Sequence, residues 1–173
     1  MNVLVIDDHP LILHAMRSVV QQLAERVEVV GVTGSQPARE ALAAGGEFDL
    51  VLLDIQLGHE DGFALLEELR SAYPALPIVV VAASDFREDV MRAIDMGAMG
   101  FVPKCSPNEV LVAALEMVLS GGIYLPPSVM RSGPQQRSAG QHGALPHWDD
   151  RLDSERAAAT VASLDLTPRQ KEV

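Results

Sequence analysis

Four side chains whose types suit metal and phosphate chemistry stand out in the sequence. Asp7 and Asp8 follow a short apolar run, Asp54 follows another, and Lys104 comes after a third. Like charges about 4 Å apart repel by about 4 kcal/mol at an effective dielectric of about 20, so three carboxylates in one cavity must hold a proton or recruit a cation. Oxygen ligands of this type suit Mg²⁺. A cation and a lysine around one carboxylate form an electrostatic clamp for phosphoryl transfer, with that carboxylate as the nucleophile.

The clamp forms only if the fold brings these residues together, and the hydrophobic pattern predicts a fold that does. Apolar runs rich in Val and Ile, without strict alternation, are typical of strands covered on both faces. Such runs lie at residues 3–6, 27–32, 50–53, 78–83 and 101–102. Helical patterns separate and follow them. This alternation predicts an α/β fold with a five-stranded parallel sheet, doubly wound with helices on both faces.

Open sheets of this kind carry their working site at the carboxyl ends of the strands. Asp7, Asp8, Asp54 and Lys104 all fall at that edge of the predicted sheet. Taken singly, an Asp after a strand most often forms a turn or caps a helix, and a Lys is most often a solvated surface residue. Because a chance placement of all four at one edge is much rarer, we interpret them as one site. Asp54 is the central candidate, since the third strand ends directly on it.

Composition argues against several other classes. With 13 Lys and Arg among 24 Asp and Glu, the net charge of -11 argues against DNA binding by this segment alone and against anionic membranes. The single cysteine excludes an internal disulfide framework, and no apolar run reaches the roughly 20 residues of a membrane span. The five histidines lack the spacing of zinc ligands, and His9 is interpreted as a turn residue at the rim of the acidic site. These features favour a cytoplasmic location.

The predicted α/β domain covers residues 1–122. Residues 123–164 are predicted to be a linker, rich in Gly, Pro, Ser and Gln at first and with a helical pattern later. Thr167, Pro168 and Gln170 have the spacing of a capping box at a helix start. Residues 165–173 are therefore expected to open a further domain, most of which would lie beyond residue 173.

Several stretches resemble known families. Three resemble the signatures of the receiver domain of two-component response regulators: 3–12 (VLVIDDHPLI), 49–54 (DLVLLD) with Gly62, and 100–104 (GFVPK). Two more, 121–127 (GGIYLPP) and 166–173 (LTPRQKEV), resemble the NarL/FixJ group, in which a LuxR-type helix-turn-helix domain follows the receiver. The resemblance implies a CheY-like, flavodoxin-like (βα)5 receiver. Such a receiver takes a phosphoryl group from a sensor histidine kinase and controls an attached DNA-binding transcriptional regulatory domain.

The same resemblance implies a role for each residue of the site. Asp54 would accept the phosphoryl group, and Lys104 would pair with the resulting phosphate. Asp8, Asp54 and the backbone carbonyl of Gln56 would bind Mg²⁺, while Asp7 would orient the site or bind through water.

The switch positions depart from the family pattern. The family usually has Thr or Ser at the end of the fourth strand, where its hydroxyl holds a phosphate oxygen, but this chain has Ala82, with Ser84 in the loop beyond. A lost hydrogen bond to a charged group costs about 1.5–3 kcal/mol, so we expect coupling of phosphate to conformation to be weakened or rewired. Gly58 replaces the usual proline and should loosen the loop that frames the site. Phe101 matches the aromatic whose burial reports activation, a position that an ordinary core residue also fills.

The last helix of the domain, residues 110–119, is apolar on more than one face. One face should cover the sheet and leave the other for a homodimer, unless Tyr124 and Leu125 fold back over it. DNA contact is expected only through the missing C-terminal domain.

Two other functions remain open beside the phosphoreceiver, which takes part in its own phosphotransfer and dephosphorylation without being an enzyme. Ala82 favours a phosphorylation-independent pseudo-receiver that serves as an interaction module. A Mg²⁺-dependent aspartyl phosphohydrolase would use Asp54 as nucleophile, but the residue two positions on is Gln56 where a second acid would be expected.

Overall fold

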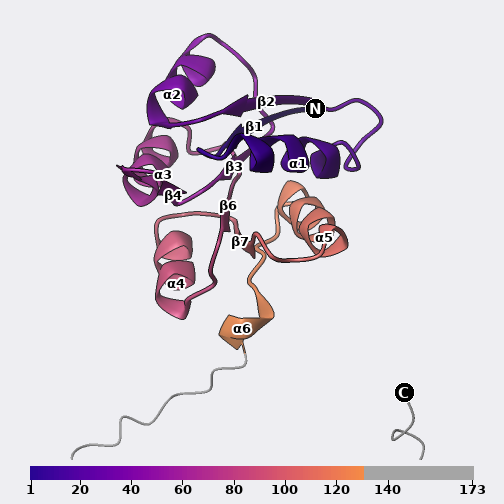
Figure 1. Cartoon of the computed structure of the whole chain (residues 1–173), viewed down its shortest axis with the longest axis vertical. Helices are drawn as coiled ribbons and strands as arrows, with labels where there is room; N and C mark the ends of the chain where they lie inside the picture. The colour runs from indigo at the N-terminus through magenta and orange to yellow at the C-terminus, as the bar shows by residue number, and fades with distance from the viewer. Residues whose placement is uncertain (131–173) are drawn as a thin grey trace, which may run out of the picture. The chain divides into compact units, whose positions relative to one another are not determined.

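The computed structural model describes residues 1–130 and confirms the predicted sheet (Figure 1). Its five strands are β1 (Asn2–Ile6), β2 (Glu28–Val32), β3 (Leu50–Leu53), β6 (Ile78–Ala82) and β7 (Gly100–Pro103). They pair in parallel in the order β2-β1-β3-β6-β7. A small antiparallel hairpin of β4 (Gln56–Leu57) and β5 (Glu60–Asp61) stands apart from this sheet, directly after β3.

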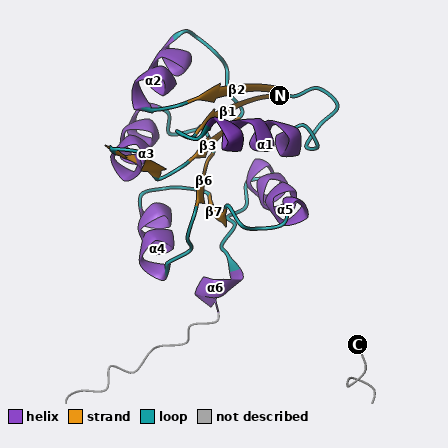
Figure 2. Ribbon diagram, viewed as in Figure 1, coloured by secondary structure: helices purple, strands orange, loops and turns teal. Residues whose placement is uncertain are grey.

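Helices cover both faces of the sheet, as the doubly wound prediction requires. They are α1 (Pro10–Val20), α2 (Ser35–Ala43), α3 (Gly62–Ala72), α4 (Arg87–Asp95), α5 (Asn108–Leu119) and the short α6 (Pro127–Met130). Figure 2 shows α1 and α5 on one side of the sheet and α2, α3 and α4 on the other. Parallel strands joined through helices place every strand's carboxyl end at the same edge.

The two faces of the sheet build two hydrophobic cores. Successive residues of a strand point to opposite faces, so a strand covered on both sides must be apolar throughout. In β1, Val3 and Val5 pack with residues of α1 and α5, whereas Leu4 and Ile6 pack with residues of α2, α3 and α4. All four are at most 2% exposed. This double burial explains why the apolar runs in the sequence do not alternate with polar residues.

The chain after α5 returns to the sheet. Tyr124 forms a parallel bridge with Gly100 of β7, and the Phe101 amide donates to the Tyr124 carbonyl at 3.1 Å. Val129 of α6 is buried in the core on the α4 side, and Arg87 Nη1 donates to its carbonyl oxygen at 2.8 Å. The first residues of the predicted linker therefore pack against the receiver-like unit through α6.

The remaining predicted linker, residues 131–164, and the predicted helix-turn-helix start at 165–173 lie outside the described residues. Within residues 1–130, none of the helices has both the length and the apolar character that crossing a membrane requires.

Candidate functional site

The sheet brings together all four residues predicted to form the site. The register pairs Ile6 with Leu53, so the residues that follow them, Asp7 and Asp54, leave neighbouring strands side by side. The Asp54 amide donates to the Ile6 carbonyl at 2.9 Å, which continues the ladder by one residue. The Lys104 amide likewise donates to the carbonyl at the end of β6 at 2.7 Å. Backbone pairing thus positions these side chains before any contact between them forms.

Lys104 lies between two buried carboxylates. Its Nζ is 2.6 Å from Asp7 Oδ2 and 2.6 Å from Asp54 Oδ2. The side chains of Asp7 and Asp54 are 4% and 1% exposed, so water screens these charge-assisted contacts only weakly. Burial lowers the pKa of the Lys104 ammonium, but hydrogen bonds and charge attraction from Asp54 and Asp7 outweigh it, and the pKa is raised overall. Lys104 is therefore the cation of the clamp.

Asp8 adds a third carboxylate and leaves the pocket with surplus negative charge. Ligand-type atoms of Asp7, Asp8, His9 and Asp54 all lie within 4.8 Å of one another. Asp8 Oδ1 is buried and makes no hydrogen bond within the described part of the chain. A Cβ at Gly58 would come within 3.2 Å of Asp8 Oδ2, so the glycine leaves room beside this carboxylate. A buried carboxylate oxygen that lacks a donor, within a cluster of carboxylates, fits a hard divalent cation.

The loop after β3 turns tightly around Asp54. The Gln56 amide donates to Asp54 Oδ1 at 2.9 Å, and the Gln56 side chain is exposed. Only its backbone therefore belongs to the site. Asp61 at the end of the hairpin caps α3 by accepting from the Phe63 amide at 2.9 Å.

A second support for this loop was not apparent from the sequence. The Glu60 carboxylate accepts hydrogen bonds from both the Ser35 hydroxyl and, at 2.7 Å, the Ser35 amide at the start of α2. These hydrogen bonds lower the pKa of Glu60. They tie the hairpin to a helix that starts 25 residues earlier in the chain, and no local sequence pattern signals so distant a partner.

Gly62 holds α3 against the backbone of the site. A Cβ at this position would lie 2.4 Å from Ile55 Cα and 2.7 Å from the Asp54 carbonyl oxygen. Both are backbone atoms, so no side-chain rotation can relieve the overlap. The glycine noted in the sequence is thus required for the close approach of helix and loop.

Replacing Gly62 with Ala should destabilise the fold by about 2 kcal/mol or more, because the loop backbone that carries Asp54 must move. Urea unfolding followed by circular dichroism measures this change. The matched control is Gly31→Ala in β2, where a Cβ would make only ordinary contacts at 3.5 Å with Leu13 and stability should change by no more than about 1 kcal/mol. Equal losses in both variants would contradict the steric argument.

The predicted switch positions lie near the site without joining the acidic cluster. Ala82 is the last residue of β6 and is fully buried, so no hydroxyl stands at that strand end. Ser84 is half-buried and lies two residues beyond the strand. Phe101 in β7 is fully buried in the core. Gly58 adopts a left-handed conformation, with φ of 59°, in the turn of the hairpin.

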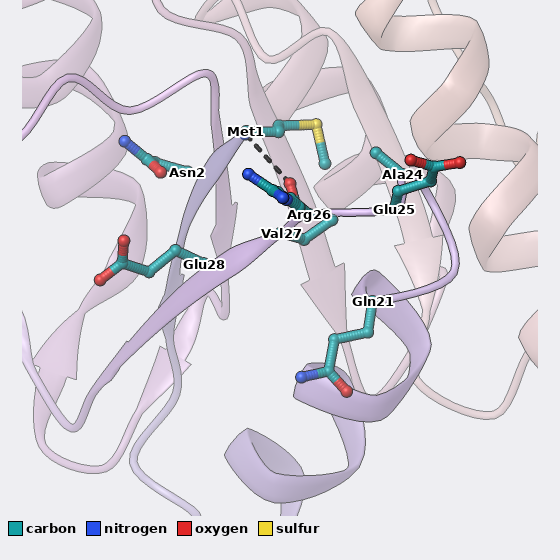
Figure 3. Close-up of a pocket in the computed structure, with 8 residues that line it drawn as sticks. All are labelled: Met1, Asn2, Gln21, Ala24, Glu25, Arg26, Val27 and Glu28. Atoms are coloured by element: carbon teal, nitrogen blue, oxygen red, sulfur yellow. Dashed lines mark hydrogen bonds between the residues drawn. The ribbon is translucent and has the colours of Figure 1, made fainter.

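The concavity in Figure 3 is a separate feature, with a volume of about 500 Å³. Its lining comes from the first residues of the chain and from the connection between α1 and β2: Met1, Asn2, Gln21, Ala24, Glu25, Arg26, Val27 and Glu28. The terminal amine of Met1 donates to the Arg26 carbonyl there at 3.2 Å. This cavity lies at the amino ends of β1 and β2, the opposite edge from the acidic pocket, so it is not part of the candidate site.

Known proteins are similar to this chain in both sequence and fold. Residues 3–116 match the family described as the response regulator receiver domain. The "Glycerol metabolism activator" of Pseudomonas putida is 33% identical over 84% of this chain and 65% of its own length. The "Nitrate/nitrite response regulator protein NarL" of Escherichia coli strain K12 is 28% identical over 99% of this chain and 72% of its own length.

A solved structure shows the same similarity. The crystal structure of a LuxR family DNA-binding response regulator from Silicibacter pomeroyi superposes with a TM-score of 0.67 at 29% identity, covering 74% of this chain and 98% of that one. In sequence, the chain spans just under two thirds of the Pseudomonas putida protein.

Proposed function

The chain belongs to the response regulator receiver domain family, and on that premise we propose that Asp54 accepts a phosphoryl group from a sensor histidine kinase. Receiver domains of the NarL/LuxR type are signalling modules of two-component systems. The observation that carries the proposal is the buried Asp54 carboxylate, which contacts Lys104 at 2.6 Å and lies within one acidic pocket with Asp7 and Asp8. A plain structural role would not require this combination, and a phosphohydrolase would be expected to have a second acid where this chain has Gln56.

The site residues divide the work of phosphoryl transfer. A carboxylate oxygen of Asp54 would attack phosphorus while the bond from phosphorus to the donor breaks, and Lys104 would pair with the phosphate oxygens. Asp8, Asp54 and the Gln56 backbone carbonyl would hold Mg²⁺, with Asp7 orienting the site or binding through water. The metal would supply positive charge that offsets the negative charge of the incoming phosphate.

The output we propose is control of transcription. Relatives with this receiver are DNA-binding or transcriptional regulators by name, and the C-terminal residues 166–173 resemble the start of a LuxR-type helix-turn-helix domain. Direct DNA contact would belong to that domain, because this chain carries a net charge of -11. The cytoplasm is the proposed location, since Cys105 is an unpaired thiol and the only cysteine in the sequence.

We further propose that phosphorylation shifts a monomer–dimer equilibrium through α5. Met117 and Leu119 of α5 are 46% and 37% exposed. These side chains remain accessible although Tyr124 packs on the same side of the sheet as α5. An exposed apolar face beside a packed helix suits a second copy of the chain.

Incubation with Mg²⁺ and acetyl phosphate, followed by intact-mass measurement, tests the function. A phosphoryl adduct that requires Mg²⁺ supports the phosphoreceiver. No adduct under any condition would favour the phosphorylation-independent interaction module, which the absence of a hydroxyl at Ala82 makes the leading alternative. Multiple turnover of added phosphoesters would instead favour a phosphohydrolase.

Restoring a hydroxyl at position 82 should strengthen the switch. Ala82→Thr would supply the hydrogen bond to a phosphate oxygen that this chain lacks, worth about 1.5–3 kcal/mol, or roughly tenfold or more in an equilibrium constant. Sedimentation with and without beryllofluoride, which mimics the phosphoryl group, measures the shift in dimerisation. Ala82→Val, similar in shape without the hydroxyl, is the control. If Thr and Val variants respond like the parent chain, the missing hydroxyl does not limit the coupling.

A further inference from the structure

The hairpin of β4 and β5, which frames the acidic pocket, is fixed to the fold at its start, at its end and near its turn. At its start, the Gln56 amide donates to Asp54 Oδ1 at 2.9 Å. At its end, Asp61 caps α3. Near its turn, the Glu60 carboxylate accepts from the Ser35 hydroxyl and, at 2.7 Å, from the Ser35 amide. The first two contacts are local in sequence, whereas the third joins the hairpin to α2 across 25 residues.

Glu60 acts as the cap of α2 from another element of the fold. The N-cap of α2 is Gly34, which has no side chain to offer, and the first turn of the helix contains no acidic residue. The first amides of a helix lack intrahelical partners, and the helix dipole favours a carboxylate beside them. Ser35 is 7% exposed, so without Glu60 its hydroxyl would have little access to water as another acceptor. The contact is therefore one that the fold maintains.

The turn of the hairpin needs such an anchor because its own backbone is permissive. Gly58 lies in this turn with φ of 59°, and glycine restricts a backbone less than any other residue. A Cβ at Gly58 would come within 3.2 Å of Asp8 Oδ2, so the turn lies directly beside the acidic pocket. Glu60 pairs with Leu57 across the hairpin, one residue from the Gln56 carbonyl that is the proposed metal ligand. A displacement of Glu60 would therefore move the hairpin relative to Asp8.

We propose that Glu60, held by Ser35, is a positioning residue for the magnesium site, because it fixes the hairpin that supplies the Gln56 carbonyl. This inference rests on the proposed function, since it uses the site formed by Asp8, Asp54 and Gln56. A ligand that is already held in place loses less conformational freedom when the ion binds, so the affinity is higher. Glu60 would act in this way without touching the ion, and α2 becomes part of the support of the site.

Isothermal titration of the chain with Mg²⁺ tests the proposal. Glu60→Leu removes both acceptor oxygens and should weaken Mg²⁺ binding by roughly three- to tenfold, less than the roughly 10–100-fold for a group bonded to a ligand itself. Glu60→Gln keeps an acceptor oxygen for Ser35 and should bind Mg²⁺ within about twofold of the parent chain. At saturating Mg²⁺, Glu60→Leu should react with acetyl phosphate at nearly the parent rate, because the loss lies in metal affinity.

Glu68→Leu is the matched control. Glu68 is an exposed carboxylate of α3 that holds α2 through Arg39, with contacts of 2.8 Å, but it does not contact the hairpin. Its replacement should leave Mg²⁺ affinity unchanged. Amide hydrogen exchange in EDTA gives a second readout that needs no metal. Exchange across residues 56–61 should be faster in Glu60→Leu than in the parent chain, and unchanged in Glu68→Leu.

The outcomes separate this inference from the function on which it rests. If the parent chain does not bind Mg²⁺, the proposed magnesium site fails and the role of Glu60 fails with it. If the parent chain binds Mg²⁺ and folded Glu60→Leu binds it as tightly, only the role of Glu60 is overturned. An equal loss of affinity in Glu68→Leu also overturns it, because a general loosening of α2 would explain both. Should Glu60→Leu not fold, Ser35→Ala removes the hydroxyl contact alone, and unchanged Mg²⁺ affinity in that variant would contradict the proposal.

Discussion

Asp54→Ala should abolish the phosphoryl adduct that acetyl phosphate forms with the parent chain in the presence of Mg²⁺. Asp54 is a buried carboxylate of the pocket that contacts Lys104 and accepts the amide of the loop that follows it. Without it the site has neither the nucleophile nor one of its proposed metal ligands. Intact-mass measurement should show no adduct under conditions that modify most of the parent protein.

A matched control shows whether the adduct forms at Asp54 or at any exposed carboxylate. Asp95 is an exposed carboxylate at the end of α4, at the opposite edge of the sheet, so Asp95→Asn should be modified like the parent chain. Asp54→Ala should also remain folded, because the contact of Lys104 with Asp7 at 2.6 Å stays in place. An adduct of undiminished yield on folded Asp54→Ala protein would contradict the assignment.

The sequence predicted the sheet and the principal site because both depend on local patterns. Short Val- and Ile-rich runs identify buried parallel strands, and parallel strands must end at a common edge. The positions of Asp7, Asp54 and Lys104 follow from that geometry alone. Hydrogen bonds from Asp54 and Lys104 to neighbouring strands show how the ladder enforces it.

Contacts between segments that are distant in sequence could not be predicted from local patterns. The run of Gly and Pro after residue 120 is typical of a linker, yet Tyr124 bridges Gly100 and Val129 enters the core. Burial of a single Val and one isolated bridge leave no periodic pattern in the sequence. The orientation of the His9 ring and the bond from Ser35 to Glu60 are of the same kind, because they arise only once the strands have assembled.

These non-local contacts bear on how a signal could leave the site. Phe101 donates its amide to Tyr124, and Arg87, just after the loop that leaves β6, donates to Val129. A movement of β7 or of α4 would therefore displace the segment that contains Tyr124 and Val129, because each is hydrogen-bonded to it. Transmission through these hydrogen bonds does not need a hydroxyl at position 82. It is a route by which phosphorylation would alter the conformation of a chain that has Ala82.

Lys104→Met should destabilise the fold by about 3 kcal/mol at neutral pH without metal, which is the lower end of the range for a broken buried ion pair. The lower end applies because 14% of the Lys104 side chain is exposed. Removing this cation leaves Asp7 and Asp54 buried side by side with no positive partner. Mg²⁺ should restore part of the loss, because an ion that binds only the folded state stabilises it. Urea unfolding in EDTA and in Mg²⁺ measures both effects.

The ion pairs of Lys104 with Asp7 and Asp54 also predict how the stability of the fold depends on pH. The pKa of Lys104 is raised above its usual value of 10.5 because contacts with Asp54 and Asp7 outweigh the effect of burial. A group whose pKa is higher in the folded state stabilises that state fully below its unfolded pKa, and the contribution is lost as pH rises through the folded value. The parent chain should therefore lose stability above about pH 10.5 and converge on Lys104→Met, while Lys104→Arg keeps its charge and should lose less. If the difference in unfolding free energy between the parent and the Met variant stays the same as pH rises through the folded pKa of Lys104, the ammonium charge does not stabilise the two aspartates.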